Sequence, residues 1–149
     1  MLDIKNTILK NKKTCYIFDV TNITDDMLDK IAFALNNGAN IIQLNPKNIT
    51  SIEFLNFSIK VRQLTSLFNA LLIIQDRVDI AIMTESDGVF LDKNSADISY
   101  VKKIFDSSKL IGSDLTYALN SDYIISNKPY QDKITYIFED NAQYKAVKR

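Results

Sequence analysis

The chain has 149 residues, no histidine and one cysteine, and its 18 basic residues balance its 18 acidic residues. The lack of histidine excludes Ser-His-Asp and Cys-His catalytic arrangements and every histidine-ligated metal site. A single cysteine, Cys15, excludes an intrachain disulfide and a cysteine-based zinc site, so any bound metal has to be a hard cation held by oxygen. The balanced charge argues against a nucleic-acid partner, which requires a basic face.

Glycine is the outlier in the composition, with 3 residues against a usual share of about 7%. Gly38, Gly88 and Gly112 lie far apart, so the chain has neither a P-loop nor a GxGxxG fingerprint. The length suits one domain spanning residues 1–149. No apolar run is long enough to span a membrane, and residues 1–13 lack the apolar region of a secretory signal, so we expect a cytoplasmic protein without a membrane partner.

Short apolar runs alternate with helical patterns along the chain. The runs lie at 15–20, 40–44, 70–74, 88–91, 109–111, 123–125 and 134–138. Most are apolar at consecutive positions, which is typical of strands buried on both faces of a parallel sheet. Amphipathic spacing and, at Thr50 and Glu53, a capping box predict the helices between them. The expected helices lie at about 27–35, 50–68, 78–83 and 98–105.

The repeated strand–helix–strand order predicts an α/β fold with a parallel sheet, either a barrel or an open doubly wound sheet. Late in the chain the connections shorten, because only residues 115–121 separate the fifth and sixth runs. A normal crossover needs about 10–12 residues, so its helix is missing or very short. The run at 134–138 is expected to be a parallel strand or an antiparallel edge. The basic tail 143–149 is interpreted as a solvated end.

Polar side chains gather where the predicted strands end, which is where parallel α/β folds place their sites. They are Asp19, Gln43, Asn45, Lys47, Gln75, Asp76, Asp92, Lys93 and Asp114. Carboxylates and amides there could hold Mg²⁺ and a phosphorylated ligand, with a lysine adding positive charge. The same residue types form turns and N-caps, the interpretation we favour for Asp19 and Asp114. An ion pair of Arg77 with Asp76 or Asp79 competes with metal binding.

Five segments, taken in order, resemble motifs of the thiamine-phosphate synthase family. They are AFALNNGANIIQLNPK (32–47), LLIIQDRVDIAI (71–82), SDGVFLDKNSAD (86–97), LIG (110–112) and SDYII (121–125). The family motifs are A-L-x-x-G-(two or three residues)-I/V-Q-L-R-x-K, L-x-I-N-D-R-x-D-I/L-A, A-D-G-V-H-L-G-Q-x-D, I-I-G and A-D-Y-I. All three glycines fall on family glycine positions. The resemblance covers about 15–125 of the single domain, and 126–149 form a diverged C-terminal segment.

The resemblance implies a (β/α)₈ barrel that joins a pyrimidine-methyl diphosphate to a thiazole phosphate. Pyrophosphate leaves with help from Mg²⁺ and cationic side chains, and the thiazole nitrogen captures the carbocation. By position, the resemblance assigns Gln43 and Lys47 to the diphosphate or pyrimidine and Asp76 to magnesium. The second magnesium ligand is Asp97, given a small insertion, or Asp92, which replaces a family glycine.

Departures from the family pattern concern the groups that bind phosphate. Asn45 replaces an arginine and Gln75 an asparagine, and both stay among the candidate ligand-binding residues. The family loop G-P-x-x-x-T-x-T-K is not recognisable in residues 126–133. The Gly-Gly-Ile loop and the final Ser-containing strand, which hold the thiazole phosphate, have no counterpart. The related thiazole tautomerases use a catalytic histidine, which this chain lacks.

These departures favour a diverged thiamine-phosphate-synthase-like protein without full synthase activity, acting as a ligand-binding or regulatory relative. The first alternative is an active synthase completed by oligomerisation, and the second is an unrelated α/β domain. In either synthase-like case the expected ligand is a phosphorylated pyrimidine or thiazole.

The expected fold is an incomplete TIM-type (β/α) barrel with about six or seven mainly parallel strands. Such a sheet cannot close as an eight-stranded barrel, so its edge strands stay open. We expect the edge to be covered by residues 1–13, by the C-terminal tail or by a second chain. A homodimer is the favoured arrangement.

Overall fold

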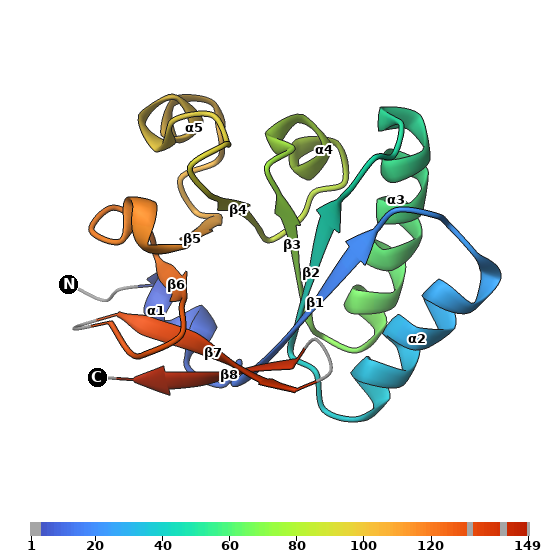
Figure 1. The fold of residues 1–149 in the computed structure, drawn as a ribbon, viewed down its shortest axis with the longest axis horizontal. Coiled ribbons are helices and arrows are strands. Elements are labelled where there is room, and N and C mark those ends of the chain that lie inside the picture. Colours follow the sequence, from blue (N-terminus) through green and yellow to red (C-terminus); the bar gives the residue numbers. More distant parts are fainter. Residues whose placement is uncertain (1–3, 131–132, 141–142, 149) are drawn as a thin grey trace.

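A computed structural model describes residues 4–130, 133–140 and 143–148. Its strands form one closed barrel in the order β1 to β8 (Figure 1). They are β1 (Thr14–Val20), β2 (Ile41–Pro46), β3 (Leu71–Gln75), β4 (Gly88–Leu91), β5 (Leu110–Ser113), β6 (Tyr123–Ile125), β7 (Ile134–Asp140) and β8 (Gln143–Lys148). The α/β barrel class is therefore confirmed, and every apolar run identified in the sequence contributes a strand.

The barrel is a parallel arc closed by one reversed strand. Strands β1 to β7 run parallel, as predicted for six or seven strands. β8 pairs antiparallel with β7 on one side and with β1 on the other, where Cys15 lies opposite Tyr144. The interpretation of the tail as a solvated end was wrong, because it supplies the eighth strand. Of the three covers expected for the sheet edge, the C-terminal tail is confirmed, because β8 pairs with both β7 and β1 and no edge stays open. A second chain is therefore not needed for closure.

Five α-helices and a 3₁₀ turn accompany the described strands. They are α1 (Ile4–Leu9), α2 (Asp25–Asn36), α3 (Ser51–Leu67), α4 (Val78–Met83), α5 (Ile98–Ile104) and η1 (Leu115–Tyr117). The predicted capping box starts α3, because the Glu53 N–H donates to Thr50 Oγ1 at 3.2 Å. Helices α2 to α5 lie outside β1 to β5, whereas the described parts of the connections after β5 and β6 contain no α-helix (Figure 1). None of the described helices is long and apolar enough to cross a bilayer.

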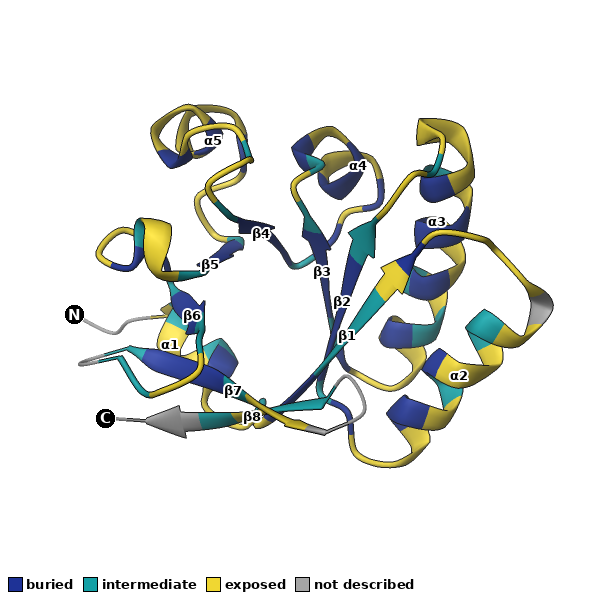
Figure 2. Cartoon of the chain, in the orientation of Figure 1, coloured by how far each residue is buried: buried dark blue, intermediate teal, exposed yellow. Residues whose placement is uncertain are grey.

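Two separate apolar clusters hold the fold together, one on each face of the sheet. Ile42 and Leu44 of β2 pack outward against the helices, whereas Ile41 belongs to the cluster inside the barrel. Most of β2 is accordingly buried (Figure 2). The interior cluster consists of Leu9, Cys15, Ile41, Ile73, Phe90, Leu110, Tyr123, Ile134 and Tyr136. Because side chains alternate along a strand, Gln43 and Gln75 share the inward face with Ile41 and Ile73. The amino-terminal part of the barrel interior is thus a packed apolar core, and the inward-facing polar groups lie nearer the carboxyl ends of the strands.

A half-buried ion pair ties the outer layer to the sheet. Arg62 of α3 donates to both carboxylate oxygens of Asp87, at 2.6 and 3.3 Å, and the Leu72 N–H donates to the same carboxylate at 2.9 Å. We expect Asp87→Ala to lower the free energy of unfolding by about 2–3 kcal/mol, because it leaves a half-buried guanidinium and a strand N–H unpaired. Urea unfolding measures the loss.

The matched control is Asp79→Ala, which breaks an exposed ion pair with Arg77. Exposed pairs contribute less than about 1 kcal/mol, so this variant should stay close to the unmodified protein. Equal losses for the two variants would contradict the structural role given to Asp87.

Candidate functional site

The carboxyl ends of β1 to β4 carry inward-facing amides and carboxylates. Gln43 lies two residues after Ile41 on β2 and therefore on the same face of the strand, and Asn45 follows on that face. Asp19 of β1 lies opposite Asn45 in the register. Asp19 therefore belongs to a strand, and its interpretation as a cap or turn was wrong. Asp114, in contrast, accepts a hydrogen bond from the Thr116 N–H at 2.9 Å and begins η1, as predicted.

Two glutamine side chains at this end each leave a buried acceptor unpaired. Gln43 donates from Nε2 to Asn45 Oδ1 at 3.0 Å, and Gln75 donates from Nε2 to Asp92 Oδ2 at 3.1 Å. Within the described residues, the Oε1 atoms of Gln43 and Gln75 accept no hydrogen bond. Burying a polar atom without a partner costs about 1–3 kcal/mol. Both oxygens are therefore ready to accept N–H donors from a ligand or from water.

Asp76 directly follows β3 and has an unusual backbone conformation. Its φ is +68°, in the left-handed region that few non-glycine residues adopt. Its N–H donates to the Phe90 carbonyl at 2.9 Å, and its carboxylate is exposed and hydrogen-bonds to no described residue. Arg77 pairs with Asp79 at 2.8 Å, which lowers the pKa of Asp79. The competing ion pair therefore forms at Asp79 and leaves the Asp76 carboxylate available.

The two candidates for a second metal ligand have different surroundings. Asp92 is half-buried, accepts from the Asn94 N–H at 2.8 Å and contacts Gln75. Asp97 is exposed and caps α5 by accepting from the Ser99 N–H and hydroxyl, which together lower its pKa. The structure thus joins Asp92 to the inward-facing amides and uses Asp97 as a helix cap.

Lys47 lies just beyond β2, at the same end of the barrel. Its backbone N–H donates to the Val20 carbonyl at 3.0 Å, which fixes the chain as it leaves the strand. Its side chain is exposed and forms no ion pair with any residue that the structure describes. Lys47 is thus positioned to present a free ammonium group to an anion at the carboxyl-terminal end of the barrel, which we call the mouth.

The described residues include no group of three or more Asp, Glu or Cys side chains that would chelate a metal by themselves. Mg²⁺ commonly takes only one or two carboxylates and keeps waters or phosphate oxygens as its other ligands. Asp76 and Asp92 follow the neighbouring parallel strands β3 and β4, and the Gln75 amide donates to Asp92. This all-oxygen donor set fits Mg²⁺ chemically.

Sequence analysis missed the contribution of Tyr144 on β8. Its side chain packs with the interior cluster and meets the Phe138 ring edge-on at 5.4 Å. Burial raises its pKa, and nearby Cys15 and Asp19 add to that effect. The alternation of Tyr144 and Ala146 with Lys145 was the available signal. It was obscured because the tail is basic.

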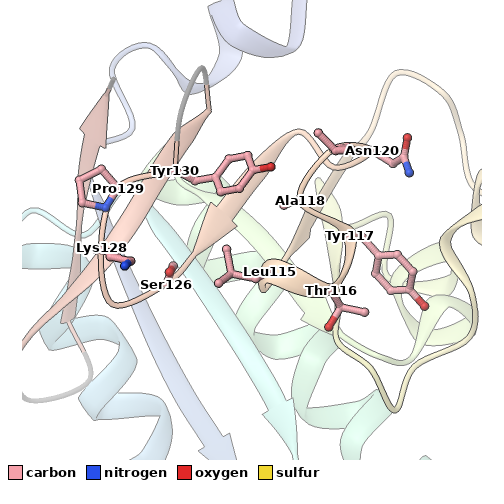
Figure 3. A pocket seen from close by; sticks show the side chains of 10 residues that line it. Leu115, Thr116, Tyr117, Ala118, Asn120, Ser126, Lys128, Pro129 and Tyr130 are labelled. Carbon is pink, nitrogen blue, oxygen red and sulfur yellow. The ribbon is translucent and has the colours of Figure 1, made fainter.

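A cavity of about 530 Å³ lies beside the mouth, between the loops that follow β5 and β6 (Figure 3). It is lined by Leu115, Thr116, Tyr117, Ala118, Leu119, Asn120, Ser126, Lys128, Pro129 and Tyr130. Tyr130 extends from one loop toward Ala118 of the other (Figure 3). A smaller cavity of about 250 Å³ shares Leu115 and Ser126 with it and reaches Asp114. The short connections therefore leave space next to the mouth.

A family model described as thiamine monophosphate synthase matches residues 14–121. The chain belongs to the thiamine monophosphate synthase family. The match contains Gln43, Asn45, Lys47, Gln75, Asp76, Asp92 and Asp97. It ends just before β6, so the last three strands of this synthase-family barrel, β6 to β8, lie outside the match.

Individual relatives are similar to only part of the chain. The thiamine-phosphate synthase of Caldanaerobacter subterraneus subsp. tengcongensis is 34% identical over 87 residues, which are 58% of this chain and 41% of the relative. That of Prochlorococcus marinus subsp. pastoris is 33% identical over 121 residues, 81% of this chain and 33% of the relative. The chain thus spans about two fifths or less of these synthases.

A solved structure supports the barrel assignment. The thiamine phosphate pyrophosphorylase from Pyrococcus furiosus superposes with a TM-score of 0.70 at 29% identity, covering 83% of this chain and 64% of that chain. This synthase-family chain therefore shares the barrel of the solved enzyme over most of its own length, while a third of the enzyme has no counterpart.

Proposed function

We propose that this synthase-family barrel binds a phosphorylated pyrimidine at its mouth and, as a diverged relative, does not complete thiamine phosphate synthesis by itself. The observation that carries the proposal is the pair of buried, unpaired Oε1 atoms on Gln43 and Gln75. Two neighbouring acceptors at the carboxyl edge suit a heteroaromatic ring that bears an amino group. A pyrimidine with such a group would remove the cost of both unpaired oxygens.

The phosphate end of such a ligand would lie toward the outer rim. Lys47 supplies an ammonium group without an ion-pair partner among the described residues. Asp76 and Asp92 would hold Mg²⁺, with Asp97 the less suitable ligand because it already caps α5. When bound, the cation would neutralise charge on the diphosphate and assist its departure.

The loss of synthase activity is inferred from two features: the few cationic groups near the expected diphosphate, and the reduced site for the thiazole phosphate. Asn45 stands where the resembling motif has arginine, and the rim carries carboxylates at Asp19, Asp76 and Asp92. A leaving diphosphate needs concentrated positive charge, which this rim supplies poorly. The connections after β5 and β6 lack the family's phosphate-binding loop. A regulatory or ligand-binding role follows from a retained pyrimidine site and a reduced thiazole site.

An active synthase is the second candidate. The cavity beside the mouth is lined by Lys128, Ser126 and Thr116, groups that bind phosphate, and it is large enough for a small heterocycle. In this case we expect oligomerisation to complete the site. A homodimer and a cytoplasmic location stay predictions from the sequence. Light scattering on the purified chain tests the first.

We expect Gln43→Leu to weaken binding of the pyrimidine-methyl diphosphate by about tenfold or more in calorimetric titration with Mg²⁺, because it removes a buried hydrogen-bond acceptor. The same change should alter the free energy of unfolding by no more than about 1 kcal/mol, because loss of the hydrogen bond from Nε2 to Asn45 is offset by removal of the unpaired buried acceptor. The control is Gln63→Leu on the exposed face of α3. Parallel assays for thiamine phosphate should show no turnover above the blank.

Two outcomes would contradict the proposal. Equal affinities of the unmodified chain and Gln43→Leu would place the ligand elsewhere. Turnover of both substrates by the purified chain would show an active synthase and overturn the inferred loss of activity. Because ligand binding raises the melting temperature by mass action, a thermal shift checks the calorimetry independently.

A further inference from the structure

The amino-terminal end of the barrel, opposite the candidate site, concentrates positive charge. Residues 4–13 contain four lysines and residues 143–148 contain two, six of the chain's 18 basic residues, with no acidic residue in either segment. These segments meet because β8 pairs with β1, with Thr14 opposite Lys145. Figure 1 shows α1 and β8 on the same side of the molecule. Whole-chain neutrality therefore conceals a basic end.

A cavity of about 470 Å³ opens at this end. It is lined by Asn6, Thr7, Leu9, Lys10, Lys13, Ile134 and Ala146. Leu9 and Ile134 are buried and belong to the interior cluster, and Ala146 packs against it. The floor is thus apolar, whereas the two lysines line the cavity from the segment that joins α1 to β1. A volume of this size lies within the range of small-molecule sites, roughly 300–1,000 Å³.

The structure uses the lysines of this end in two different ways. Lys5 pairs with Asp122 at 3.1 Å, Lys12 donates to the Asn69 carbonyl at 3.1 Å, and Lys145 donates to Thr14 Oγ1 at 3.1 Å. Lys10 and Lys13, the two that line the cavity, are exposed and make no side-chain hydrogen bond or ion pair within the described part of the chain. The cavity therefore has two unneutralised ammonium groups and no carboxylate among its lining residues.

We propose that this cavity is a second binding site, for an organic anion with an apolar or aromatic body and a phosphate or carboxylate group. The apolar body would cover Leu9, Ile134 and Ala146, and the anionic group would lie between Lys10 and Lys13. An inorganic anion would gain only the charge interaction, and a neutral aromatic compound only the apolar contact. The site therefore selects molecules that combine both properties.

Occupancy of this site would couple ligand binding to closure of the barrel. The lining residues come from α1, the segment that joins it to β1, β7 and β8, which include parts distant in sequence and the reversed closing strand. A ligand that binds the assembled cavity stabilises this arrangement by mass action. We therefore expect the second site to regulate the stability of the chain independently of the mouth.

The test uses 1-naphthyl phosphate and 1-naphthoate as probes, compared with 1-naphthol and inorganic phosphate. Both naphthyl anions should bind in calorimetric titration, and the two reference compounds should bind at least about tenfold more weakly. The double variant Lys10→Met, Lys13→Met should weaken 1-naphthyl phosphate about tenfold, whereas Lys60→Met on exposed α3 should not. Tight binding of 1-naphthyl phosphate alone, or of 1-naphthoate alone, would support the site and would identify which anionic group it accepts.

Equal binding of 1-naphthol and 1-naphthyl phosphate would overturn the proposal, as would unchanged affinity in the double variant. Methyl-labelled NMR spectra give a readout that does not depend on the variants. The probe should shift the methyl signals of Leu9, Ile134 and Ala146 and leave those of Leu115 unchanged. Shifts confined to Leu115 would place the probe beside the mouth and contradict a second site. A negative result here leaves pyrimidine binding at the mouth unaffected, so the two proposals fail separately.

Discussion

Gly112→Ala is expected to lower the free energy of unfolding by about 3 kcal/mol, because the barrel interior has no room for a methyl group at this position. A Cβ there would lie within 2.6 Å of three ring carbons of Tyr123. Tyr123 is fully buried and packs edge-to-face on Tyr136 with ring centroids 5.5 Å apart. The ring therefore cannot move aside without displacing the rest of the interior cluster.

Urea unfolding of four chains tests this explanation: the unmodified chain, Gly112→Ala, Tyr123→Leu and the double variant. Leucine removes the ring carbons that oppose the new methyl group, so the double variant should recover at least about 1 kcal/mol of the loss expected from additivity. Strictly additive losses would show that Gly112 is required for another reason. The Tyr123 hydroxyl has no hydrogen-bond partner among the described residues, so truncating it does not break an existing bond.

A chain that ends at Asp140 is expected to lose the closed barrel. β8 pairs with β1 at Thr14, Cys15 and Tyr16 and with β7 from Ile134 onward. Without it both neighbours become edge strands, and the interior cluster around Cys15 opens to water. The Cys15 thiol should then react with a thiol reagent about a hundredfold faster than in the full chain. In the full chain, burial of Cys15 raises its pKa and keeps the thiol protonated.

Point variants on β8 provide a matched test that keeps the full length. Ala146→Asp puts a charge beside the interior cluster and should reproduce the faster reaction of Cys15. Lys145→Ala, on the opposite face, removes a part-buried hydrogen bond to Thr14 but leaves the interior cluster unchanged, so Cys15 should stay protected. Protection of Cys15 in the truncated chain would mean that residues outside β8 cover the sheet edge, for example in a dimer. Light scattering would then identify that dimer.

The sequence by itself determined the elements that depend on local patterns. Consecutive apolar runs located β1 to β7, because strands buried on both faces need apolar residues at successive positions. The hydroxyl of Thr50 and the spacing to Glu53 located the start of α3, because both partners lie within one helical turn. The position of Gln43, Gln75 and Asp76 at strand ends was also predictable, since parallel strands bring their carboxyl ends to one side.

Only the tertiary structure decided how the barrel closes and which polar groups stay unpaired. β8 is basic, and it is a strand because β1, more than a hundred residues earlier, offers an unpaired edge. The contact of Gln75 with Asp92, and the cap that occupies Asp97, depend on where neighbouring strands and α5 come to lie. The basic cavity joins Lys10 and Lys13 to Ala146 through the same closure. Local sequence patterns determine each element. A site made by distant segments forms only when long-range strand pairing offsets the entropy cost of closing the loop between them.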